Sequence, residues 1–174
     1  MDSTAVIFPH QLFRNNPCFK RDRITYLMED PWFFRDPENL LKFHQQKLVL
    51  HRASMQAYRD FFRSRGYLVR YLEFTQEMDM GYLFDLFRQD GISEIVTCEP
   101  VERGLKERLI RRAEAWRMKV NVLTPPMFLC SEGDIGDFFP GRQKFHQTSS
   151  YIFQRRRWDI LLENGKHLDV RPPD

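Results

Sequence analysis

The chain has 174 residues, of which 42% are hydrophobic, and this suits one globular domain with a sizeable core. Its net charge of +3 is mildly basic, so a polyanionic partner is permitted but not required. The apolar runs are too short to cross a bilayer and no secretory signal is apparent. We therefore expect a cytoplasmic protein without membrane contact.

The first 126 residues alternate short apolar runs with amphipathic stretches. Strands are predicted at 4–8, 23–28, 67–72, 92–98 and 120–123, and helices at 40–65, 80–89 and 102–117. Gly66 and Gly91 follow the first two helices, as residues at helix C-termini often do. This rhythm gives βαβ units. It predicts a doubly wound α/β domain with a five-stranded parallel sheet, Rossmann-like but without a GxGxxG fingerprint.

The predicted helix at 40–65 has two unlike faces. Its apolar stripe recurs every seven residues with two further members beside it: Leu48, Met55, Phe62, Val49 and Phe61. A second group lies three, four or seven residues apart along the N-terminal half: Phe43, His44, Lys47, His51 and Arg52. This group is placed to meet a ligand at the sheet edge, or it is the solvated face of a packing helix.

Residues 127–174 do not continue the strand–helix pattern and form a helical extension and tail. A short helix is predicted at 131–138, with Ser131 as its N-cap and Asp134 at capping-box distance. A turn and a loose tail are predicted from residue 164 onward. The extension is therefore not expected to join the sheet.

The segment 143–162 is aromatic and basic. Arg155, Arg156 and Arg157 lie near Tyr151 and Trp158, a combination that can contact phosphates and stack on bases. The same residues suit an amphipathic helix packed on protein with its arginines solvated. We favour this second interpretation.

Three predicted strand ends carry polar or aromatic residues. In open α/β sheets, ligands bind outside the carboxyl ends of the strands. Gln11, Glu29 and Glu99 are able to hydrogen-bond a heterocycle, and Trp32 or Phe33 to cover its face. Alternatively, the two glutamates are only charged residues at strand ends. The whole candidate set for a small-molecule pocket is His10, Gln11, Leu12, Glu29, Trp32, Phe33, Lys47, Leu48, His51, Glu99 and Glu102.

Several kinds of chemistry have no motif in this sequence. There is no Walker loop, GxSxG or HExxH, and the five histidines have no Cys or carboxylate companions at metal-ligand spacing. The three cysteines are scattered, and we expect them to be reduced thiols that bind no metal. We therefore expect neither a catalytic residue set nor a metal site.

These stretches resemble the deoxyribodipyrimidine photolyase-related family, the iron–sulfur-containing prokaryotic members of the photolyase/cryptochrome group. The resemblance covers nearly the whole chain and is most specific in the long helix. The similar segments are 8–13 (FPHQLF), 29–34 (EDPWFF), 42–55 (KFHQQKLVLHRASM), 98–100 (CEP, where the family has TEP), 126–129 (PMFL) and 147–158. Many members have Gly-Asp before Gln-Leu, where this chain has Pro9 and His10.

The resemblance implies an N-terminal antenna domain in a light-driven DNA repair protein, spanning residues 1–126. Its small-molecule chromophore would be a ribityllumazine or a flavin-like pigment that passes energy to FAD. FAD, the iron–sulfur cluster and the DNA lesion would be held by a helical domain toward which residues 127–174 lead, or by a separate partner chain. The domain would resemble part of a lyase and would not be catalytic alone. Two other hypotheses are a stand-alone nucleotide-binding or interaction module that has lost the pigment, and direct DNA binding by the basic C-terminal helix.

Overall fold

A computed structural model of the chain describes residues 2–35, 42–76, 79–141, 144, 146–163 and 166–167. The chain divides into two compact units, Met1–Met127 and Phe128–Asp174. The N-terminal unit contains the parallel sheet. Among its described residues, the C-terminal unit contains two helices and a short pair of strands.

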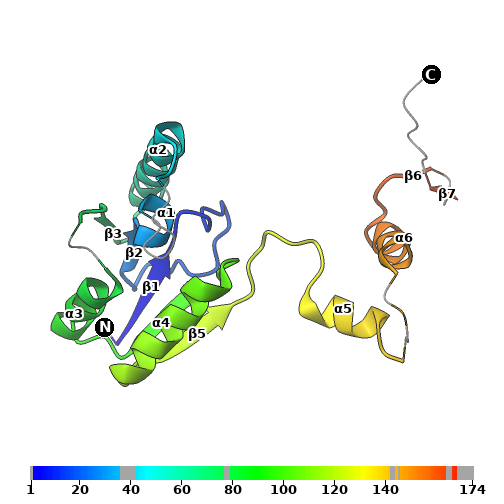
Figure 1. Ribbon diagram of the computed structural model, residues 1–174. Coiled ribbons are helices and arrows are strands. Elements are labelled where there is room, and N and C mark those ends of the chain that lie inside the picture. The colour runs from blue at the N-terminus through cyan, green and yellow to red at the C-terminus, as the bar shows by residue number, and fades with distance from the viewer. Residues whose placement is uncertain are drawn as a thin grey trace. The chain divides into compact units, whose positions relative to one another are not determined.

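The N-terminal unit is a five-stranded, all-parallel sheet flanked by helices (Figure 1). Its strands are β1 (Ser3–Ile7), β2 (Thr25–Met28), β3 (Val69–Leu72), β4 (Glu94–Cys98) and β5 (Lys119–Leu123). They lie in the order β3-β2-β1-β4-β5, which is that of a doubly wound sheet. The predicted fold class is confirmed, with strand ends shifted by one or two residues.

Alternation along β1 distributes its side chains between two cores. Val6 lies in the core on one face of the sheet, with residues of α3 and α4. Ala5 and Ile7 lie in the core on the other face, with residues of α2. Figure 1 shows the corresponding layers, with α2 on one side of the sheet and α3 and α4 on the other. Because both faces are covered, the three central strands β1, β2 and β4 are almost entirely buried.

The long helix α2 spans Gln45–Arg63. Its N-cap is His44, whose Nδ1 accepts the backbone N–H of Gln46 at 3.2 Å. The predicted start at Leu40 lies outside the described residues. Met55 and Phe62 are buried as predicted, but Val49 is 66% exposed and does not belong to the apolar stripe. At 100° per residue, Val49 is about 120° around the helix from Met55, whereas Leu48 is only about 20° away.

Three shorter helices complete the N-terminal unit. Helix α1 (Pro31–Phe34) is a single turn that follows β2, and the Asp30 carboxylate caps it by accepting the Trp32 N–H at 2.9 Å. Helix α3 (Met80–Gln89) has the predicted bounds. Helix α4 (Arg103–Ala115) begins directly after the β4 loop. Both α3 and α4 direct apolar residues into one core.

The C-terminal unit contains α5 (Glu132–Phe138) and α6 (Gln147–Trp158). The predicted capping box at Ser131 and Asp134 is present in full. Strands β6 (Leu162–Glu163) and β7 (Lys166–His167) pair antiparallel. Strand β7 lies in the segment for which the sequence predicts a turn and a loose tail, whereas β6 precedes that segment.

The arginines of α6 are less solvated than predicted. Arg155 is 8% exposed and donates to the carbonyl oxygens of Ile160 and Leu161. Arg157 forms an ion pair with Asp134 at 2.5 Å. Two of the three arginines therefore have partners inside this unit.

Candidate functional site

The site lies at the point where the sheet order reverses. Strand β1 has β2 on one side and β4 on the other, so the loops after β1 and β4 leave the sheet side by side. They meet where the Val101 N–H donates to Nε2 of His10 at 3.3 Å. This is the position at which open α/β sheets bind ligands.

Gln11 supports this edge from inside the protein. Its side chain is fully buried, Nε2 donates to the Cys98 carbonyl at 2.6 Å, and Oε1 accepts the Phe8 N–H at 3.0 Å. The amide therefore joins the end of β1 to the end of β4. The sequence predicts that Gln11 hydrogen-bonds a ligand, whereas in the structure its amide forms hydrogen bonds with the protein's own backbone.

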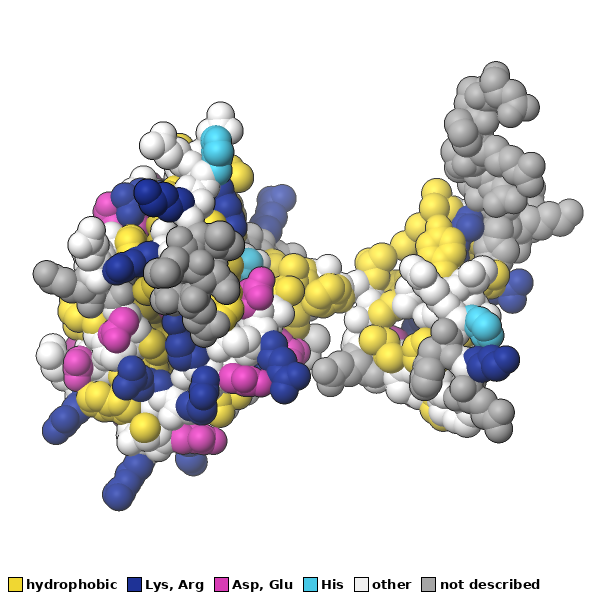
Figure 2. Space-filling model, viewed as in Figure 1, with side chains coloured by type: hydrophobic (Ala, Val, Ile, Leu, Met, Phe, Trp, Pro, Cys, Tyr) yellow, Lys and Arg dark blue, Asp and Glu magenta, His cyan; other side chains and the backbone are white. Residues whose placement is uncertain are grey.

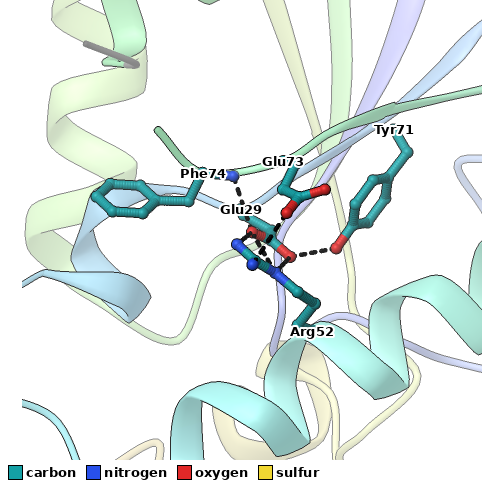
Figure 3. A network of polar contacts seen from close by, with 5 residues as sticks. All are labelled: Glu29, Arg52, Tyr71, Glu73 and Phe74. Carbon is teal, nitrogen blue, oxygen red and sulfur yellow. Dashed lines mark hydrogen bonds and ion pairs between the residues drawn. The ribbon is translucent and has the colours of Figure 1, made fainter. Parts of the chain in front are cut away.

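Glu29 is likewise buried and bonded within the protein (Figure 3). Arg52 of α2 approaches its carboxylate with two nitrogens, Nε to Oε1 at 2.9 Å and Nη2 to Oε2 at 2.6 Å. The Phe74 N–H donates to Oε2 at 2.8 Å, and the Tyr71 hydroxyl donates to Oε1. Arg52 also pairs with Glu73 at 2.9 Å. This network fastens α2 to the ends of β2 and β3.

Two histidines flank Phe33 at the same edge. The His10 ring stacks on the Phe33 ring with centroids 5.1 Å apart. The His51 ring meets Phe33 edge-on at 5.9 Å. Within the described part of the chain, Nδ1 of His10 and Nε2 of His51 are buried and have no hydrogen-bond partner. Burying a ring nitrogen without a hydrogen-bond partner costs free energy. A ligand that hydrogen-bonds these two atoms would therefore gain binding free energy.

Burial keeps both imidazoles neutral at pH 7. It lowers the pKa of His10 to about 4, with a smaller contribution from the nearby His51. Burial also lowers the pKa of His51, and the charge of Lys47 adds to this effect. Since Nε2 of His10 accepts a hydrogen bond, its proton is on Nδ1. His10 therefore presents a buried N–H donor without a partner in the described structure.

Glu99 lines a pocket of about 350 Å³ beside the β4–α4 loop. Its carboxylate pairs with Lys106 at 2.5 Å, and both side chains are about one-third exposed. The pocket is lined by Glu99, Pro100, Val101, Arg103, Lys106, Glu107 and Ile110. Through Val101 it adjoins the ring of His10. This polar pocket therefore lies next to the stacked rings of His10 and Phe33.

The remaining candidates lie around this edge. Trp32 is partly buried against the core, where Arg108 lies over its ring at 5.5 Å. Leu12 packs against the core on the α2 face of the sheet, and Leu48 packs against the core on the α3 and α4 face. Both side chains add apolar surface near this edge. Lys47 is exposed, with its amine 4.1 Å from the Phe43 ring centroid. The eleventh candidate, Glu102, is exposed at the N-cap position of α4.

Metal-binding clusters and membrane-spanning helices are both absent from the described residues. No group of three or more His, Cys, Asp or Glu side chains among them is arranged to hold a metal ion. None of the helices in the same residues is long and apolar enough to span a membrane.

The comparison with protein families decides the ancestry of this fold. The model of the deoxyribodipyrimidine photo-lyase-related proteins matches residues 5–168. The chain belongs to this family. It is also 31% identical to uncharacterized protein R852 of Acanthamoeba polyphaga mimivirus, over 97% of this chain and 89% of the viral protein. The viral relative of this photolyase-related chain thus consists mainly of the same region.

Sequence reasoning missed two parts of the edge in this photolyase-related protein. The sequence predicts that Arg52 either meets a ligand or lies on a solvated helix face, but its guanidinium is held by Glu29. The sequence analysis gives no role to Asp30, yet its carboxylate is buried and pairs with Arg108 at 2.5 Å. Burial raises the pKa of Asp30, while the Arg108 charge opposes that rise. The available signal was a pair of neighbouring acidic residues, Glu29 and Asp30, directly after an apolar strand.

Proposed function

We propose that this protein is a non-catalytic antenna domain that binds a flat heteroaromatic pigment, a ribityllumazine or a flavin-like molecule. The ligand would lie at the carboxyl edge of the sheet against His10, Phe33 and His51. The observation that carries the proposal is the pair of buried ring nitrogens, Nδ1 of His10 and Nε2 of His51, which have no partner among the described residues. A pteridine-type ring has carbonyl oxygens and ring nitrogens that match such groups.

His10 and Phe33 supply the orientation of the ring. The N–H of a neutral His10 donates to a ligand carbonyl, while the Phe33 face offers stacking area. His51 adds a second polar contact from α2. Because burial disfavours protonation of both imidazoles, the two rings stay uncharged and suit a neutral ligand ring better than an anionic one.

The polar pocket suits the hydroxylated chain of such a pigment. Its volume of about 350 Å³ is at the lower end of the range for small-molecule sites. Glu99 and Lys106 offer an acceptor and a donor to hydroxyl groups. Gln11 and Glu29 act as positioning residues, because their hydrogen-bonding groups are used inside the protein.

When bound, the pigment would absorb near-ultraviolet or blue light and pass the excitation on by dipole coupling, without a covalent step. In this proposal FAD, the iron–sulfur cluster and DNA belong to a helical domain or a separate partner chain. On the face shown in Figure 2, Lys and Arg side chains of the N-terminal unit are scattered among acidic ones. Such a face offers no basic stripe for a DNA backbone.

A second candidate is a stand-alone nucleotide-binding or interaction module that has lost the pigment. The observation in its favour is the viral relative, of which this chain covers 89%. Direct DNA binding by α6 has less support, because Arg155 and Arg157 already have partners within their own unit.

Fluorescence titration of the purified protein with 6,7-dimethyl-8-ribityllumazine and with riboflavin tests the proposal. We expect saturable binding of one of them, weakened about tenfold by His51→Phe through loss of one hydrogen bond of about 1.4 kcal/mol. The matched control is His44→Asn, an exposed histidine of the same helix whose replacement keeps a capping side chain. If neither ligand binds, the proposal is rejected and the stand-alone module is the remaining hypothesis. If wild type and His51→Phe bind with equal affinity, His51 is not part of the site.

A further inference from the structure

Two cysteine side chains from distant parts of the chain face each other in the core beneath α2. Cys18 lies in the connection between β1 and β2, and Cys98 is the last residue of β4. Both are fully buried in the same core, and their Sγ atoms are 3.6 Å apart. A disulfide needs a separation of about 2.05 Å, so the two sulfurs lie about 1.5 Å from bonding distance.

Polar groups hold both cysteines in place. Asn16 accepts the Cys18 N–H at 3.0 Å, and the Cys98 thiol approaches the same amide oxygen at 3.7 Å. The side chain of Asn16 also donates to the Gln11 carbonyl at 2.9 Å, while Arg23 donates to the Cys18 carbonyl. Because each backbone segment is fixed, the sulfurs are expected to stay close together and not to rotate apart.

The two thiols are not equivalent. The hydrogen bond from Cys18 lowers the pKa of Cys98, although burial opposes this. The same hydrogen bond, together with burial, raises the pKa of Cys18. Cys98 is therefore the sulfur that more readily becomes a thiolate, and the thiolate is the reactive form.

We propose that Cys18 and Cys98 form a reversible intramolecular disulfide that joins the β1–β2 connection to the end of β4. With hydrogen peroxide as oxidant, the Cys98 thiolate attacks one peroxide oxygen, the O–O bond breaks, and the released hydroxide takes up the Cys98 proton to give water. The sulfur of Cys18 then displaces hydroxide from the sulfenic acid on Cys98, and this hydroxide leaves as a second water with the Cys18 proton. Two thiols and one peroxide give one disulfide and two waters, and two electrons pass from sulfur to oxygen.

The cross-link would act on the ligand-binding edge. The Cys98 carbonyl accepts the hydrogen bond from Gln11, and the next residue, Glu99, lines the pocket. A sulfur movement of about 1.5 Å at Cys98 therefore pulls on the contact between the β1 and β4 ends. This consequence rests on the proposed ligand site, whereas the disulfide itself does not.

Peptide mapping of the full chain tests the proposal. The protein is incubated with hydrogen peroxide, quenched, alkylated and digested without reductant. We expect a Cys18–Cys98 linked peptide, a fall from three free thiols to one, and full reversal by dithiothreitol. The buried sulfurs should react over minutes to hours, because oxidation waits for local opening of the core.

Variants sharpen the result. Cys130→Ala should leave the linked peptide unchanged, whereas Cys98→Ala should abolish it. Loss of thiols with no Cys18–Cys98 peptide, or irreversible oxidation of Cys98 to the sulfinic acid, would overturn the proposal. Riboflavin affinity is then compared between reduced and oxidised protein. A linked peptide without any riboflavin or lumazine binding leaves the disulfide standing and rejects the ligand site, so the two failures are distinguishable.

Discussion

The ion pair between Glu29 and Arg52 offers a quantitative test of how α2 is held at the site. The Glu29 side chain is completely buried, whereas that of Arg52 is 37% exposed. Replacing Arg52 with alanine leaves a buried carboxylate that keeps the Tyr71 hydroxyl and the Phe74 N–H as hydrogen-bond donors. Breaking a buried pair in this way costs about 3–5 kcal/mol. Since water reaches the Arg52 end, we expect a loss of about 2–4 kcal/mol of unfolding free energy.

Urea unfolding followed by circular dichroism measures this loss. The matched control is Arg103→Ala, which removes an exposed i,i+4 pair with Glu107 and should leave the urea midpoint almost unchanged. A double-mutant cycle with Glu29→Gln should give a coupling energy above about 1 kcal/mol. If Arg52→Ala and Arg103→Ala unfold at the same urea concentration, the reasoning about the buried carboxylate is refuted.

Three further predictions concern single contacts. Gly104→Ala should destabilise the protein by about 1–3 kcal/mol in urea, because its Cβ would lie 2.7 Å from a Trp32 ring carbon; a Trp32→Leu background should remove most of that cost. The pKa of His10 is 6.5 in the unfolded chain and about 4 in the folded protein. His10 therefore contributes up to about 3 kcal/mol to the unfolding free energy above pH 6.5, and this contribution is lost as the pH falls toward 4. Unfolding of His10→Gln between pH 7 and 4.5 should show a correspondingly flatter pH dependence, and an unchanged slope would contradict the neutral imidazole. The Cys18–Cys98 disulfide closes a loop across a separation of 80 residues and should stabilise the oxidised chain by about 4 kcal/mol, measured as a shift of the urea midpoint that reduction reverses.

The architecture could be predicted from the sequence because its signals are local. The bounds of α3 follow from Leu83, Leu86 and Phe87 on one side and from Gly91 after the end. The capping box of α5 follows from the three-residue spacing between Ser131 and Asp134. The pair β6–β7 could not be predicted, because strands of two residues are too short to show a period.

The chemistry of the site was only partly predictable. The sequence placed Gln11, Glu29 and Glu99 at strand ends correctly, but it could not show which of them are used inside the protein. The partner of Glu29 is Arg52, 23 residues away on another element, and the choice depends on packing across the sheet edge. The gathering of His10 and His51 around Phe33 likewise depends on topology and not on spacing.

The most direct test of the ligand site is the imidazole nitrogen NMR spectrum at pH 7, recorded with and without 6,7-dimethyl-8-ribityllumazine. Without ligand, we expect His10 to be neutral with its proton on Nδ1, because Nε2 accepts the Val101 N–H. On addition of the lumazine, the signals of His10 and His51 should shift and that of the exposed His44 should not. A charged His10 at pH 7, or a lumazine titration that shifts neither His10 nor His51, would contradict the account.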